Sequence, residues 1–177
     1  MTLPYPKTVI SRVLSMWSGD MRSRETFLGF IIDTNRINAR GALAHMNRLE
    51  RWRNDGVIEL LMSDVAHVEA LAGRDPRRSR KASRYVRSLS FEHEADAKKN
   101  QALIADILFP DGRRSSNDVN DVCIVYHALK YGLILITADR AILRKRVELK
   151  SALGIRVMTD AEAVSCVEER ICERDKE

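Results

Sequence analysis

Short and almost wholly apolar runs recur along the chain at 27–32, 57–62 and 133–137. Runs of this length are typical of strands that are buried on both faces of a parallel sheet. Helical spacing of apolar residues lies between them, most clearly at 42–52 and 119–131. Strands that alternate with helices indicate βαβ crossovers. The pattern therefore predicts an α/β fold, a three-layer sandwich in which helices flank a central parallel sheet.

The chain divides into an N-terminal extension, residues 1–27, and one domain, residues 28–177. A length of 177 residues suits a single domain with a sizeable core. In the extension, Val9, Val13 and Trp17 have helical spacing and predict an accessory helix. The remaining elements of the domain are expected as helices at 65–71, 95–108, 140–153 and 161–172 and as a strand at 155–158.

The composition limits the classes of function that this chain can have, but it does not identify one. The net charge of +5 and the sequence pI of about 9.3 permit binding to a polyanion such as RNA. The three cysteines form no Cys-x-x-Cys pair, so neither a disulfide framework nor a zinc site is indicated, and a cytoplasmic location is expected. The apolar runs are far shorter than the roughly 20 residues that span a bilayer, so no membrane partner is expected.

Two acidic residues stand where strands are predicted to end. Asp33 directly follows the run at 27–32, and Asp139 comes two residues after the run at 133–137. Ligands of open parallel sheets bind beyond the carboxyl ends of the strands. If the two strands are neighbours, these carboxylates meet at one edge of the sheet.

Two further acids, Glu69 and Asp121, lie within the first turns of predicted helices. Carboxylates gathered at one edge repel one another unless a cation neutralises them. Mg²⁺ and Mn²⁺ prefer oxygen ligands and bind carboxylates together with substrate phosphate. The four acids therefore predict a divalent metal site that serves phosphodiester chemistry.

Four segments resemble those of the PIN-domain nucleases, which include the VapC-type toxin ribonucleases of toxin–antitoxin pairs. They are Ile-Ile-Asp-Thr-Asn at 31–35, Ser-Asp-Val-Ala-His-Val-Glu at 63–69, Asp-Val-Cys-Ile-Val-Tyr-His-Ala at 121–128 and Leu-Ile-Thr-Ala-Asp at 135–139. The resemblance extends over residues 28–158. It implies a metal-dependent endoribonuclease that uses Mg²⁺ or Mn²⁺ and has a parallel sheet flanked by helices.

The resemblance also implies roles for individual residues. The metal ligands, which also orient the attacking water, are Asp33, Glu69, Asp121 and Asp139. Asn35 and Thr137 are expected to support them through hydrogen bonds. The chain departs from the family at Arg36, where an apolar residue is usual, and at Val125-Tyr126, where small residues are common.

Ordinary structural roles compete with these assignments. Asp64 and Asp118 are best explained as acids in a first helical turn, where the helix dipole favours negative charge. Asp118 also lies three residues before Asp121 and shares its helix face, so it is kept as a supporting residue. Asn35 and Thr137 are common residue types in turns and strands respectively.

The middle of the chain carries its densest basic cluster. It consists of Arg74, Arg77, Arg78, Arg80, Lys81 and Arg84, with Arg87 just beyond. Such a cluster is often only a solvated face, but it is also the pattern of a surface that binds RNA phosphates. We expect it to contribute to RNA binding.

Other functions fit the sequence less well. A non-catalytic nucleic-acid-binding or scaffold protein on the same fold remains the alternative, although the presence of all four acids disfavours it. A haloacid-dehalogenase phosphatase requires an Asp where Asn35 stands, and a nucleotide triphosphatase requires a Gly-x-x-x-x-Gly-Lys loop that the sequence lacks. The expected partners are RNA and an inhibitory antitoxin protein, and a homodimer is left open.

Overall fold

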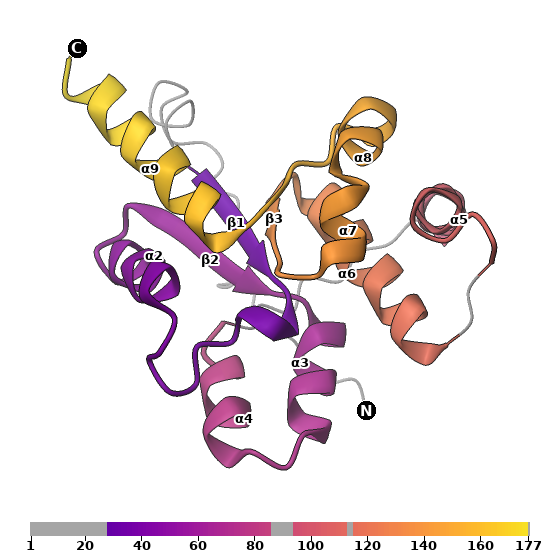
Figure 1. Cartoon of the computed structure of the whole chain (residues 1–177), viewed down its shortest axis with the longest axis horizontal. Coiled ribbons are helices and arrows are strands. Elements are labelled where there is room, and N and C mark those ends of the chain that lie inside the picture. Colours follow the sequence, from indigo (N-terminus) through magenta and orange to yellow (C-terminus); the bar gives the residue numbers. More distant parts are fainter. Residues whose placement is uncertain (1–27, 86–93, 113–114, 177) are drawn as a thin grey trace, which may run out of the picture.

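The computed structural model describes residues 28–85, 94–112 and 115–176 (Figure 1). The N-terminal extension and its expected accessory helix lie outside the described residues, as does Arg87. The described parts contain four strands, eight α-helices and one short 3-10 helix. In chain order these are β1 (Leu28–Ile32), η2 (Thr34–Arg36), α2 (Ala44–Asn54), β2 (Ile58–Met62), α3 (Asp64–Ala72), α4 (Pro76–Ala82), α5 (Glu94–Leu108), α6 (Ser116–Tyr131), β3 (Ile134–Ile136), α7 (Arg140–Arg144), α8 (Arg146–Leu153), β4 (Val157–Met158) and α9 (Asp160–Arg174).

All four strands are parallel, and they are ordered β2-β1-β3-β4 across the sheet. In β1, Phe30, Ile31 and Ile32 are all almost completely buried, as expected for a strand covered on both faces. Strand β1 lies between β2 and β3, so the carboxyl ends of these three strands share one edge. The predicted neighbourhood of the strands before Asp33 and Asp139 is confirmed.

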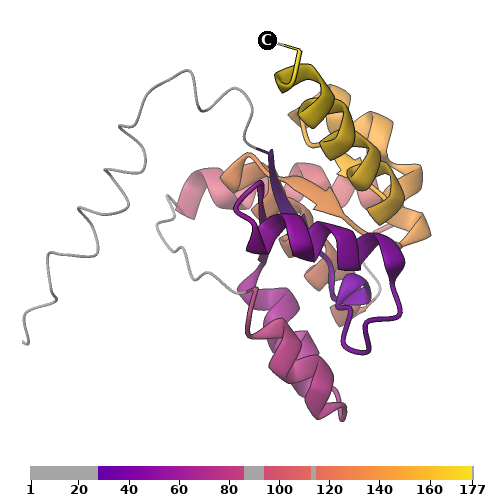
Figure 2. The same ribbon diagram turned by 90° about the vertical axis from the view of Figure 1, so that its left-hand side faces the viewer.

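Helices cover both faces of the sheet (Figures 1 and 2). Helices α2 and α9 pack against each other over one face, and α6 lies against β3 on the other face, with α5 packed outside it. The predicted three-layer α/β sandwich is confirmed. Helices α3 and α4 pack side by side and project from the body of the domain (Figure 2).

Local signals in the sequence place several helix ends. The Ser63 side chain accepts a hydrogen bond from the amide of Ala66 and starts α3, and Ser115 starts α6 with a capping box. Gly132 ends α6 at φ 62°, a left-handed conformation that favours glycine.

One predicted helix is divided in the structure. The helix expected at 140–153 is broken at Lys145, whose φ and ψ of −94° and 5° leave the helical region, so that α7 and α8 are separate. Nothing in the local sequence marks this break, since neither Pro nor Gly occurs there. None of the helices in the described part of the chain has the length and apolar character needed to cross a membrane.

Candidate active site

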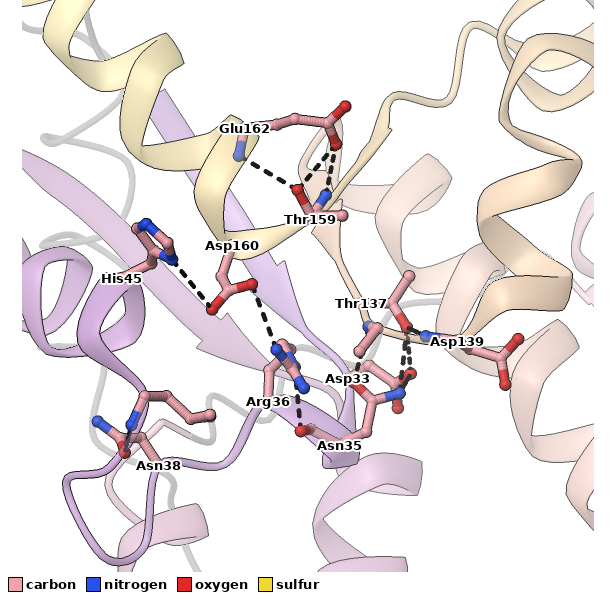
Figure 3. A network of polar contacts seen from close by, with 12 residues as sticks. Asp33, Asn35, Arg36, Asn38, His45, Thr137, Asp139, Thr159, Asp160 and Glu162 are labelled. Atoms are coloured by element: carbon pink, nitrogen blue, oxygen red, sulfur yellow. Dashed lines mark hydrogen bonds and ion pairs between the residues drawn. The ribbon is translucent and has the colours of Figure 1, made fainter.

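Asp33 is the most enclosed of the predicted acids. It follows β1, is only 4% exposed, and its backbone amide donates to the carbonyl of Ile136 in β3 at 3.0 Å. Its Oδ2 accepts hydrogen bonds of 2.6 Å from both the Asn35 Nδ2 and the Thr137 hydroxyl (Figure 3). A buried carboxylate is stable only with such partners. The supporting contacts expected of Asn35 and Thr137 are therefore present in the structure.

Thr137 connects Asp33 to Asp139. Its hydroxyl donates to Asp33 and accepts a 2.9 Å hydrogen bond from the backbone amide of Asp139. Asp139 in turn starts α7, because its Oδ1 accepts from the amides of Ala141 at 2.6 Å and Ile142 at 3.1 Å. One oxygen of this carboxylate thus caps a helix, and Oδ2 remains for other ligands.

Thr34 connects Asp33 to Glu69, and no signal in the sequence marks it for this role. Its hydroxyl lies 3.1 Å from Asp33 Oδ1 and 3.3 Å from Glu69 Oε2. A hydroxyl has a single proton, so it donates to one of these carboxylates at a time. Glu69 itself is exposed on α3, in the second turn of that helix rather than the first.

Asp121 is half-buried on α6 and lies within electrostatic reach of the other acids. Its pKa is raised from 3.8 to about 7, first by burial and then by the negative charges of Asp33, Asp139, Glu69 and Asp118. Burial and like charges both disfavour the charged form of a carboxyl group. The four acids predicted from separate segments are therefore close enough to interact electrostatically.

Asp118 has the capping role that its position favoured. Its carboxylate accepts from the backbone amide and the hydroxyl of Ser115, at 3.1 and 2.7 Å. It still raises the pKa of Asp121 through its charge. Asp118 therefore affects Asp121 through its charge, while its own hydrogen bonds hold the start of α6. We call the four acids Asp33, Glu69, Asp121 and Asp139 the acidic cluster.

The donor set suits a hard divalent cation, although it is not a closed cage. All four side chains offer carboxylate oxygens, which Mg²⁺ and Mn²⁺ prefer. Among the described residues, no group of three or more His, Cys, Asp or Glu side chains is already arranged to hold a metal ion. Mg²⁺ commonly uses one or two carboxylates and completes its shell with water and substrate phosphate. The residues present therefore fit such an ion.

The basic cluster is divided by the fold into exposed and engaged side chains. Exposed on the surface are Arg74, Arg77, Arg80 and Arg84. Lys81 instead forms a 2.6 Å salt bridge with Glu50 of α2. Arg78 points inward and donates through Nη2 to the carbonyl of Thr34 at 2.8 Å. Packing of α4 on the domain thus turns Lys81 and Arg78 inward, and the contribution of the cluster to RNA binding stays a prediction.

The same packing brings in a basic residue that lies outside the cluster in the sequence. Arg40, in the loop after η2, lines a hollow of about 450 Å³ together with Arg74 and Arg77. Its guanidinium is exposed and lies 4.0 Å from Asp75. No sequence signal separates Arg40 from other loop arginines, since the loop and α4 are brought together only by the fold.

Comparison with known structures confirms the kind of fold. A chain in the crystal structure of VapBC2 from Rickettsia felis bound to a DNA fragment from their promoter is similar at a TM-score of 0.50 and 15% identity, over 75% of this chain and 98% of that one. A chain in the structure of VapBC-1 from nontypeable Haemophilus influenzae is similar at a TM-score of 0.51 and 19% identity, over 76% of this chain and 99% of that one.

The chain has a PIN-like fold. No protein-family model matches the sequence, and no curated protein matches it significantly. The resemblance predicted from the four segments is thus confirmed at the level of the fold. At 15% and 19% identity this likeness shows the fold alone.

Proposed function

We propose that this PIN-like protein is a metal-dependent endoribonuclease whose active site consists of Asp33, Glu69, Asp121 and Asp139. The observation that supports the proposal is the electrostatic proximity of these acids, which come from four separate segments of the chain. Hydrogen bonds through Thr34 and Thr137 join three of them. Asp121 interacts with the other three through their negative charges, which raise its pKa.

A bound Mg²⁺ or Mn²⁺ ion would supply an activated water and offset charge on the scissile phosphate. The chain's own residues would orient the ligands. Asn35 and Thr137 hold Asp33 Oδ2, and the first amides of α7 hold Asp139 Oδ1. Asp33 and Asp139 would thus meet the ion in a fixed direction, which reduces the reorganisation needed for reaction.

RNA is proposed as the substrate because an exposed basic surface accompanies the acids. This basic rim consists of Arg40, Arg74, Arg77, Arg80 and Arg84. It extends along α4, the helix that packs on α3, which carries Glu69. Arginine is well suited to phosphate, since its planar guanidinium can donate two parallel hydrogen bonds.

We further propose that an inhibitory antitoxin protein pairs with this chain, because both similar structures are of VapBC proteins. Co-expression with the product of a small adjacent gene should then relieve growth inhibition and block RNA cleavage. Cleavage that the adjacent product leaves unchanged would remove the antitoxin from the proposal. It would not affect the nuclease assignment.

The decisive experiment is incubation of the full-length protein with a mixed RNA pool, with Mn²⁺ or Mg²⁺ and separately with chelator. Asp33→Asn, which keeps the side-chain shape, is the matched control. Cleavage by the wild type that requires metal and is lost in Asp33→Asn supports the proposal. Cleavage that survives chelator would refute metal dependence, and RNA binding without cleavage would favour the non-catalytic alternative.

A further inference from the structure

The turn that follows β1 is held by two guanidinium groups. Arg78, from α4, donates to the carbonyl of Thr34 at 2.8 Å. Arg36, at the end of η2, donates through Nε to the carbonyl of Asn35 at 3.0 Å. Charged donors form stronger hydrogen bonds than neutral ones. Two consecutive carbonyls of the turn are therefore fixed by positive groups.

Arg36 is fixed in turn by α9. Its Nη1 lies 3.2 Å from Asp160 Oδ1, and the two side chains are only 18% and 14% exposed (Figure 3). The other oxygen of Asp160 lies 4.0 Å from His45 Nδ1 on α2. The turn is thus tied to the pair of helices that covers one face of the sheet.

Arg78 reaches the turn from a helix that is anchored on its other side. In the same helix Lys81 binds Glu50 of α2, and Tyr85, just after α4, donates its hydroxyl to Glu50. Burial and Glu50 together raise the pKa of Tyr85, so it stays a donor. The contacts with Glu50 therefore hold α4 against α2, and this position of α4 brings Arg78 to the turn.

The environment of Arg78 differs from that of its neighbours on α4. Its Nε is fully enclosed and has no hydrogen-bond partner among the described residues, whereas Arg77 and Arg80 are exposed. A buried donor without a partner costs free energy. Contact with RNA at the surface does not require a buried Nε. The enclosed position of Arg78 therefore points to a role at the Thr34 carbonyl.

Thr34 and Asn35 carry this support to the acids. The Thr34 hydroxyl contacts both Asp33 and Glu69, and the Asn35 amide contacts Asp33. We propose that Arg36 and Arg78 are positioning residues of the acidic cluster, which act through the turn and do not contact RNA. The inference rests on the proposed function for its kinetic consequences, but the positioning itself is independent of cleavage.

The test compares Arg78→Ala and Arg78→Lys with Arg80→Ala, which removes the same charge from an exposed position on the same helix. Changes to groups that orient metal ligands typically weaken metal binding or activity by about 10-fold or more. Arg78→Ala should therefore weaken Mn²⁺ binding in calorimetry and lower kcat about 10-fold, with KM and the salt dependence of RNA binding unchanged. Arg80→Ala should show the reverse pattern, with unchanged Mn²⁺ affinity and a smaller salt slope.

Amide hydrogen exchange gives a readout that needs neither metal nor RNA. The amides of Arg36 and Ile37 donate to the carbonyls of Asp33 and Thr34, so they should exchange faster in Arg78→Ala. If the wild type cuts no RNA, the proposed function fails while this measurement still decides the positioning role. If Arg78→Ala does not fold, Arg78→Lys and Arg36→Lys take its place, since both keep the charge but lose the planar fork.

The positioning role is overturned by either of two results. One is unchanged exchange at Arg36 and Ile37 together with unchanged Mn²⁺ affinity in the folded Arg78 variant. The other is an Arg78 variant whose single defect is a reduced salt slope of RNA binding, because that defect identifies a phosphate contact.

Discussion

Asp121→Asn should stabilise the metal-free protein while abolishing cleavage. The Asp121 carboxyl has a pKa of about 7 in the folded chain, against an ordinary value of 3.8. The folded state therefore binds a proton between these pH values that the unfolded state has released, and stability falls as pH rises from about 4 to about 7. Asparagine keeps the shape of the side chain and removes the charge that causes this loss.

The size of the effect follows from the same pKa difference. A rise from 3.8 to about 7 corresponds to at most about 4–5 kcal/mol at about 1.4 kcal/mol per pH unit. Because Asp121 is only half-buried and solvent screens its neighbours, we expect about 1–2 kcal/mol at pH 8. For a chain of this size that is a rise in Tm of roughly 2–8 °C.

The assay is thermal melting of both proteins in chelator at low salt, at pH 5 and at pH 8, beside an RNA cleavage assay. The gap in Tm should be smaller at pH 5 than at pH 8. Asp96→Asn, which changes an exposed carboxylate on α5, is the matched control and should show no such gap. Mn²⁺ should then stabilise the wild type more than Asp121→Asn, because the proposed site uses all four acids to bind the ion.

One outcome would refute the assignment of Asp121 to the active site. If Asp121→Asn melts below the wild type at pH 8 in chelator and still cuts RNA, Asp121 is a structural residue of α6. The acidic cluster would then consist of the three acids joined by the hydrogen bonds of Thr34 and Thr137.

Three further predictions test the other parts of the site. Asp33→Asn should weaken Mn²⁺ binding sharply in titration calorimetry, and equal binding by the two proteins would contradict the metal site. Thr137→Val should lower stability by about 1–3 kcal/mol, measured by denaturant unfolding, because it removes the hydroxyl from a buried carboxylate; unchanged stability would show that Asp33 finds another donor. Changing Arg40, Arg74 and Arg77 together to Ala should flatten the salt dependence of RNA binding by up to about one unit of slope per lost phosphate contact. An unchanged slope would mean that this part of the basic rim faces away from RNA.

The positions of the acids could be predicted because the relevant signals are local. The apolar run before Asp33 and the run before Asp139 each mark a strand, and parallel strands direct their carboxyl ends to one edge. The Ser63 and Ser115 caps likewise fix where α3 and α6 begin, and so where Glu69 and Asp121 fall. For these residues, local patterns are enough to place the side chain near the site.

The residues that the sequence did not reveal depend on contacts between distant segments. Arg77, Arg78 and Arg80 look alike in the sequence, and only the packing of α4 on α3, which contacts η2, brings Arg78 to the Thr34 carbonyl. Arg36 stood out merely as a departure from the family pattern, since its partner Asp160 is 124 positions away. Hydrophobic periodicity and helix-capping signals carry no information about contacts between residues so far apart in the sequence.

The hydrogen bond between Thr137 and Asp33 also has a consequence for how the sheet aligns. In the pairing of β1 with β3, Ile31 lies beside Leu135 and Ile32 beside Ile136, and these apolar partners are nearly interchangeable. The next pair along brings Asp33 to the Thr137 hydroxyl. A slip of one residue would place the buried Asp33 carboxylate beside Ile136 or Ala138, neither of which has a side-chain donor. The polar residues at the end of these strands therefore select one alignment among several that the apolar residues would tolerate.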